Sequence, residues 1–179
     1  MEYNVLDILS FIIAVTAFVL SLISFKTNQK WKVLEFAGNE IKSLKENAYN
    51  QAALKMLDWN AAKYSRINLT ENDEQKIITI KDEDLINGLG PINGTSKYSI
   101  EEKFVRDCFD QFLDSLETLE IHIEENLVPF EKYQPYLKYY MDIINGKTKR
   151  KPKKVLDAIN AHMTEFNYDK AINFCQRFA

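Results

Sequence analysis

An apolar run near the N-terminus constrains this chain more than any other feature of its sequence. Residues 8–25 contain no charged side chain. At about 1.5 Å of rise per residue, a helix over this run spans roughly 27 Å, close to the thickness of the hydrocarbon core of a bilayer. We therefore expect a single membrane-spanning helix, with residues 1–26 as the anchor.

A cleaved signal peptide and the core helix of a soluble domain are the alternatives for this run. A signal peptide carries basic residues before its apolar segment and a small-residue cleavage site after it. Here Glu2 and Asp7 are the only charged side chains before the run, and the bulky Phe25 ends it. The pattern therefore favours an anchor that is retained.

Basic residues on one side of the run predict its orientation. Lys26, Lys30 and Lys32 follow the run, and neither Lys nor Arg precedes it. Segments with basic flanking residues usually remain in the cytoplasm. We therefore expect the N-terminus outside and residues 27–179 as a cytoplasmic helical domain.

Small side chains recur along one side of the anchor, at alternating spacings of four and three residues. They are Ser10, Ala14, Ala17, Ser21 and Ser24. Small residues let two helix backbones approach closely, and hydroxyl groups hydrogen-bond across such a contact. This stripe predicts parallel self-association and hence a homo-oligomer.

Two other interpretations of the stripe remain open. The helix could tolerate Ser and Ala without contacting another helix. An oligomer could also line a water-filled path with the stripe, which we favour least because the stripe has no ionisable residue deeper than Asp7.

Helical periodicity dominates the rest of the sequence and predicts an all-α fold. The expected helices cover residues 31–44, 48–64, 99–126, 135–145, 153–165 and 168–177. The first of them continues the anchor helix if no break intervenes. Residues 66–98 hold the only β-branched run and the only stretch dense in Gly and Pro, so we expect an irregular connection with one short strand or helical turn.

The longest of these helices is expected to organise the domain. It begins with a capping box, in which the Ser99 hydroxyl and the Glu102 carboxylate satisfy free backbone amides. Its apolar seam consists of Val105, Phe109, Phe112, Leu116, Leu119 and Ile123. Because apolar stripes must be buried, we expect an antiparallel helical bundle packed around this seam.

Residues suited to metal binding or nucleophilic catalysis are scarce. Cys108 and Cys175 lack the paired spacing of a zinc site, and no Glu-x-x-His pair surrounds His122. We expect both thiols to be buried and reduced. We expect no metal, no cofactor and no catalytic residue.

Six basic side chains fall within eight residues, although the net charge of the chain is −3. They are Lys147, Lys149, Arg150, Lys151, Lys153 and Lys154. Such a segment attracts the anionic cytoplasmic leaflet or the phosphates of nucleic acid. Tethering to a membrane favours the lipid surface, so we take these residues as a candidate anionic-surface contact and do not expect nucleic-acid binding. The alternative is an exposed loop, with or without pairing to the acidic side chains of residues 107–124, which we expect to form a solvated helix face.

Two stretches carry a resemblance to other proteins. Residues 112–144 read FLDSLETLEIHIEENLVPFEKYQPYLKYYMDII, and residues 56–59 read MLDW. In these stretches and in its N-terminal membrane helix, the chain resembles a loose group of uncharacterised bacterial membrane-anchored proteins with a helical domain. It departs from their pattern at Asn126, where Gly often precedes Leu-Val, and at Tyr140, where Trp is common. The resemblance implies a protein of the bacterial inner membrane and, by analogy, a role in defence against phage.

These features together predict a membrane-anchored helical interaction or scaffold protein without enzymatic activity. We expect it to self-associate and to belong to a bacterial defence or envelope complex. Its expected partners are membrane lipid, other copies of the chain and a protein that the sequence does not identify. The alternative function is a membrane-perturbing effector, triggered by a signal that binds the cytoplasmic bundle.

Overall fold

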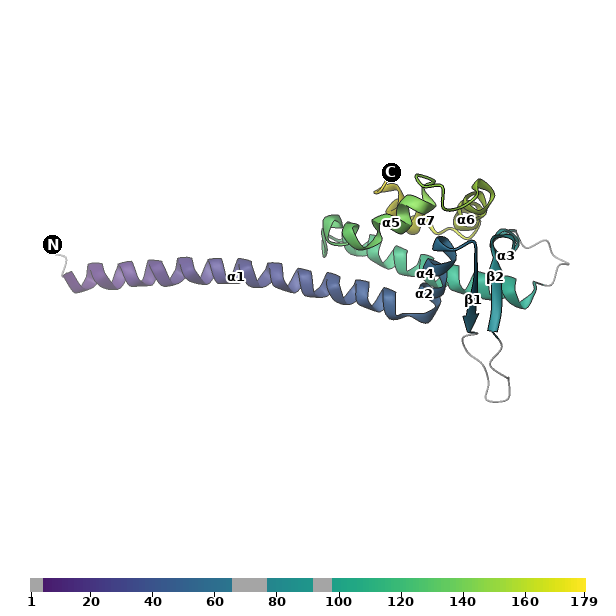
Figure 1. The fold of residues 1–179 in the computed structure, drawn as a ribbon. Coiled ribbons are helices and arrows are strands. Elements are labelled where there is room, and N and C mark those ends of the chain that lie inside the picture. Colours follow the sequence, from purple (N-terminus) through teal and green to yellow (C-terminus); the bar gives the residue numbers. More distant parts are fainter. Residues whose placement is uncertain (1–4, 66–76, 92–97) are drawn as a thin grey trace.

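The structure is a computed structural model that describes residues 5–65, 77–91 and 98–179. One long N-terminal helix leads into a helical domain that includes a two-stranded sheet (Figure 1). The predicted order of an apolar helix followed by a helical domain is confirmed. The predicted irregular connection falls partly on residues 66–76 and 92–97, which lie outside the described residues.

The apolar run belongs to α1 (Val5–Glu46), and it is not a core helix of the described domain. Phe11, Phe18 and Leu22 are 69%, 65% and 46% exposed. By length and composition, α1 is able to span a membrane, and none of its apolar window is buried. Figure 1 shows this half of α1 standing away from the domain.

The second half of α1 packs into the domain. Ala37, Ile41 and Leu44 are each 4% exposed and join the hydrophobic core. The helix runs from the apolar segment to Glu46 without a break, so the expected helix over residues 31–44 is its continuation. The apolar run and the domain are therefore linked by one continuous helix.

A corner separates α1 from α2 (Ala48–Asp58). Asn47 caps α2, because its Oδ1 accepts hydrogen bonds from the N–H groups of Tyr49 and Asn50 at 2.9 and 3.1 Å. The prediction of a helix over residues 48–64 is wrong in its last part. The backbone becomes extended at Trp59, and β1 (Ala61–Ser65) follows.

The strand β1 pairs antiparallel with β2 (Ile77–Lys81). The register places Tyr64 opposite Ile78 and Ala62 opposite Ile80. Tyr64, Ile78 and Ile80 are buried, so alternate side chains cover the core while the strands satisfy each other's backbone groups. This burial explains why residues with helix-forming side chains adopt a strand here.

The helix α3 (Asp82–Gly88) follows β2 directly and packs against α4 (Ile100–Glu124). A Cβ atom on Gly88 would lie 2.7 Å from the carbonyl oxygen of Glu102, so only glycine permits this approach. The connection over residues 66–98 thus contains both a strand and a helix, where the sequence predicted one short element.

The helix α4 forms the centre of the domain, as predicted. Its capping box is present, because Ser99 Oγ accepts a hydrogen bond from the Glu102 N–H at 3.1 Å and the Glu102 carboxylate accepts one from the Ser99 N–H at 2.8 Å. Along the predicted seam, the side chains from Val105 to Leu119 are at most 2% exposed. They pack against α2, α3 and α7.

The C-terminal part of the chain closes the domain. It consists of the 3-10 turn η1 (Phe130–Lys132) and the helices α5 (Gln134–Ile144), α6 (Lys153–Glu165) and α7 (Asp169–Gln176). These helices agree with the predicted ranges to within a residue or two. Gly146, with φ of +69°, follows α5 at a position that favours glycine. The helix α7 lies along α4, and α6 packs on α3.

Candidate functional site

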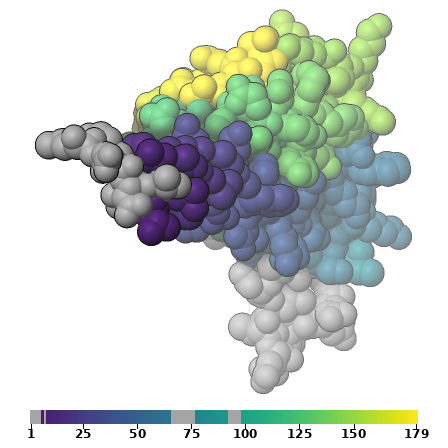
Figure 2. Space-filling model, turned by 90° about the vertical axis from the view of Figure 1, so that its left-hand side faces the viewer, coloured from purple at the N-terminus to yellow at the C-terminus, as the bar shows by residue number. Residues whose placement is uncertain are grey.

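The small-residue stripe lies on a free side of α1. Its residues are all exposed: Ser10, Ala14, Ala17, Ser21 and Ser24. At about 100° of turn per residue, they point roughly 170° away from Ala37, Ile41 and Leu44, the residues that α1 buries in the domain. Seen from the N-terminal end, the described domain lies above and to the right of α1 (Figure 2). The stripe therefore faces away from the domain.

If α1 crosses a bilayer with Phe25 at its boundary, the continuous helix also sets the height of the domain above that membrane. From Phe25 to Glu46, α1 rises about 31 Å, and a tilt of about 40° still leaves about 24 Å along the membrane normal. Trp31, which is 67% exposed, lies about 9 Å beyond Phe25, which in that case would place it in the interfacial layer where Trp is enriched. The corner between α1 and α2 thus lies well beyond the roughly 8 Å over which exposed charges interact at physiological salt.

The basic segment forms the connection between α5 and α6, and one of its members is internal. The Lys151 side chain is 0% exposed. Its ammonium donates hydrogen bonds to the Trp59 carbonyl oxygen at 2.8 Å and to Asp82 Oδ1 at 2.5 Å. Lys151 therefore joins the α5–α6 connection to the end of α2 and the start of α3. The prediction that Lys151 contacts an anionic surface is wrong, because its charge is neutralised inside the protein.

Two further side chains hold the same connection. Asn145 Nδ2 donates to the Cys175 carbonyl oxygen at 2.8 Å, and Lys147 Nζ donates to the Phe178 carbonyl oxygen at 2.5 Å. Both acceptors lie at the end of the chain, in or just after α7. Figure 1 shows the connection on the part of the domain distant from the free half of α1. The predicted surface contact thus lies far from the expected bilayer.

An open pocket of about 630 Å³ lies beside these anchored residues, and we call it the α5–α6 pocket. Its lining includes Lys149, Arg150 and Lys153, which are exposed. In the described part of the chain, Lys149 and Lys153 have no ion-pair partner, whereas Arg150 Nε lies 3.8 Å from Asp58 Oδ1. Lys154 is exposed beside Lys153 but does not line the pocket.

The prediction of a solvated acidic face on α4 is wrong in part: Asp107 and Asp114 are exposed, but Glu117, Glu120 and Glu124 contact Lys170 and Arg177, in α7 and directly after it. Glu120 is 2% exposed and accepts two hydrogen bonds from Arg177, at 2.7 and 2.8 Å. These bonds raise the pKa of the Arg177 guanidinium. Glu124 pairs with Lys170, and Glu117 accepts a hydrogen bond from the Lys170 N–H at 3.2 Å. The partners of Glu117, Glu120 and Glu124 are therefore Lys170 and Arg177, not members of the basic segment.

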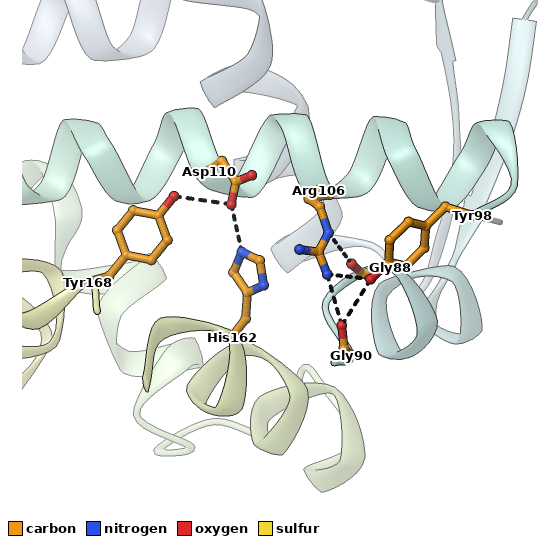
Figure 3. A network of polar contacts seen from close by, with 7 residues as sticks. All are labelled: Gly88, Gly90, Tyr98, Arg106, Asp110, His162 and Tyr168. Carbon is orange, nitrogen blue, oxygen red and sulfur yellow. Dashed lines mark hydrogen bonds and ion pairs between the residues drawn. The ribbon is translucent and has the colours of Figure 1, made fainter. Parts of the chain in front are cut away.

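A polar network around Arg106 links several elements (Figure 3). Its guanidinium donates to the carbonyl oxygens of Gly88 at 3.1 Å and Gly90 at 2.9 Å, and to the Tyr98 hydroxyl at 2.7 Å. The guanidinium carbon also lies 4.9 Å from the centroid of the Phe166 ring. Arg106 thus fastens the end of α3 to α4 and covers the end of α6.

A second group of polar contacts in Figure 3 joins α4 to α6 and α7. His162 Nε2 lies 2.6 Å from Asp110 Oδ1, and the Tyr168 hydroxyl donates to the same oxygen at 3.2 Å. Burial and the Asp110 charge raise the pKa of Tyr168. His162 is 0% exposed, and its Nδ1 is buried without a hydrogen-bond partner among the described residues. A general base must reach a substrate with its free nitrogen, so this Asp–His pair is suited to holding helices together.

The two thiols are buried, as predicted. Burial raises the pKa of Cys108, and it raises the pKa of Cys175 to about 12. Both thiols are therefore poor nucleophiles at neutral pH. Among residues 5–65, 77–91 and 98–179, no group of three or more His, Cys, Asp or Glu side chains is arranged to hold a metal ion.

Sequence reasoning missed both the α5–α6 pocket and the polar networks. Asp110 and His162 are 52 positions apart, and Arg106 is 18 positions from Gly88, so no local spacing marks either network. The pocket has a weak local signal. Pro152 directly precedes α6, and the first turn then holds Lys153 and Lys154, where acidic residues are usual.

Comparisons of the chain with family models, curated protein sequences and solved structures find no match. The resemblance to bacterial membrane-anchored proteins stays a prediction.

Proposed function

We propose that the chain is a membrane-anchored interaction protein that self-associates through α1 and has no enzymatic activity. The observation that carries this proposal is the contrast between the two halves of α1. The apolar half leaves its window entirely unburied, whereas the second half packs into the core. In water, so many exposed apolar side chains would be strongly unfavourable, and a bilayer removes that cost.

The proposed location is the bacterial inner membrane, with the N-terminus outside and the domain in the cytoplasm. Lys26, Lys30 and Lys32 at one end of the run support this orientation. The two unpaired thiols of the domain suit a reducing compartment. The bacterial setting, and membership of a defence or envelope complex, rest on the resemblance described above.

Self-association is supported by the position of the small-residue stripe on the side of α1 away from the domain. Two anchors in contact through Ser10, Ala14 and Ala17 would leave their domains on opposite sides of the helix pair. Because α1 is continuous to Glu46, pairing in the membrane would also hold the two domains at a defined distance. Such an arrangement suits a scaffold, with a protein partner bound to the domain.

Cysteine crosslinking in membranes tests this proposal. Single Cys substitutions at Ala14 and Ala17 are expected to form disulfide-linked dimers on oxidation. Matched substitutions at Val15 and Val19, which point toward the domain side of α1, are expected to form far fewer. The buried native thiols provide little background. Equal crosslinking at all four positions would exclude association through the stripe.

The α5–α6 pocket favours the alternative function, a membrane-perturbing effector triggered by a bound signal. A scaffold and an effector differ in what their accumulation does to the membrane. Measurement of membrane potential with a fluorescent dye in expressing cells separates them. A stable membrane potential is expected for the scaffold. Depolarisation that disappears when the small residues of the stripe are replaced would favour the effector.

A further inference from the structure

The α5–α6 pocket is built on a backbone that is already fixed. Asn145, Lys147 and Lys151 direct their side chains into the domain and bind carbonyl or carboxylate oxygens there. Asn145 and Lys151 also line the pocket, and the exposed basic residues Lys149 and Lys153 line it beside them. A segment held in this way loses little conformational freedom when a ligand binds, which favours affinity.

The charges around the pocket are incompletely balanced in the described structure. The helix α6 starts at Lys153, directly after Pro152, and no side chain caps its first turn. That turn contains no acidic residue, and Lys153 and Lys154 add positive charge where the helix dipole already makes it unfavourable. A bound anion would relieve both deficits, because it accepts hydrogen bonds from N–H groups at the start of the helix and neutralises Lys153, which lines the pocket.

From this geometry we propose that the α5–α6 pocket binds a soluble phosphate-bearing molecule of nucleotide size. Its volume of about 630 Å³ lies within the usual range for small-molecule sites, about 300–1,000 Å³. Lys149, Arg150 and Lys153 supply positive charge for the phosphates. Ile144 and Leu156 provide apolar lining for a ring, and the wall also carries side-chain amides that can hydrogen-bond to its edge. The proposal goes beyond the scaffold function, and only its choice of a soluble ligand over a lipid surface rests on the proposed membrane anchor.

The surroundings favour a small soluble ligand over a membrane surface or a nucleic acid. The pocket includes Asn60, which lies just beyond α2, and α1 places even the near end of α2 about 24–31 Å from the hydrocarbon core. Carboxylates also limit the positive area, because Asp157 lines the pocket and Asp58 lies beside Arg150. The extended phosphate backbone of a nucleic acid would be repelled by these carboxylates. A compact ligand can bind the lysines without approaching them.

Isothermal titration calorimetry of the full chain in neutral phosphatidylcholine nanodiscs tests the proposal, with ATP as the probe and adenosine as the phosphate-free control. ATP is expected to bind and adenosine to bind far more weakly. Lys149→Ala and Lys153→Ala are each expected to weaken ATP binding about tenfold, as for loss of one charge-assisted hydrogen bond. Lys154→Ala is the matched control, because it removes the same charge from the same turn outside the pocket. It is expected to change the affinity less than about twofold.

Several results would overturn the proposal. They include absence of ATP binding at about 1 mM, equal binding of adenosine, and equal weakening by Lys154→Ala. Two further titrations test whether the phosphate group that binds in the pocket belongs to a lipid or to a nucleic acid. Loss of ATP binding when phosphatidylglycerol is added to the nanodisc would assign the pocket to a lipid headgroup. Much tighter binding of a single-stranded oligonucleotide, with the same sensitivity to Lys153→Ala, would assign it to nucleic acid.

Discussion

Replacement of Lys151 by Met tests whether one buried ion pair holds the C-terminal helices to the sheet region. Met preserves a long unbranched side chain, so packing changes little. The substitution removes hydrogen bonds of 2.8 Å to the Trp59 carbonyl oxygen and 2.5 Å to Asp82. Loss of one partner from a buried pair costs about 3–5 kcal/mol. Because the Asp82 side chain keeps 18% exposure, water recovers part of that cost, and we expect destabilisation of about 3 kcal/mol.

Thermal unfolding of the full chain in detergent, followed by circular dichroism, measures this effect. A loss of about 3 kcal/mol lowers the midpoint by roughly 6–12 °C for a protein of this size. Lys153→Met is the matched control, and its exposed side chain predicts a change within about 0.5 kcal/mol. Adding Asp82→Asn to Lys151→Met should restore part of the stability, because it removes the unpaired carboxylate. Equal midpoints for Lys151→Met and Lys153→Met would refute the internal role of Lys151.

The remaining predictions concern the packing of α3 and the two thiols. Gly88→Ala is expected to destabilise the domain by about 1–3 kcal/mol in the same unfolding assay, because its Cβ would press on the Glu102 carbonyl. Gly38→Ala, with nothing within 4 Å of the added Cβ in α1, is expected to be neutral or stabilising, and the reverse order of the two variants would contradict the close packing of α3 on α4. Cys108 and Cys175 are expected to resist maleimide in the folded protein between pH 7 and about 9, because a raised thiol pKa keeps the thiolate fraction low over that range. Mass spectrometry should show labelling only after denaturation, and fast modification of the native protein would argue against this burial.

The elements that the sequence predicted well are those whose signal is local. The apolar run in α1 and the four-three seam of α4 are periodic patterns, and the capping box at Ser99 is a four-residue motif. The glycine after α5, Gly146, is a similar local signal. In each case the conformation that the short segment favours by itself is also the conformation that it adopts in the folded domain.

The features that could not be predicted from the sequence depend on contacts between distant segments. Residues 61–65 include helix-forming alanines, yet pairing with β2 and burial of Tyr64 make them a strand. Lys151 resembles its basic neighbours in sequence, and only its position beside Asp82 makes it an internal residue. Likewise, Glu120 is buried because Arg177, 57 positions later, supplies a bidentate partner. Charge spacing within α4 alone cannot reveal such a partner.

Extraction of membranes with alkaline carbonate tests the central claim that α1 spans a bilayer. This treatment releases proteins bound at the membrane surface and leaves those with a spanning helix in the sedimented fraction. Membranes from cells that express the full chain should retain it in the pellet, because residues 8–25 have no apolar partner in the described domain. Recovery of the chain in the carbonate supernatant would contradict the account.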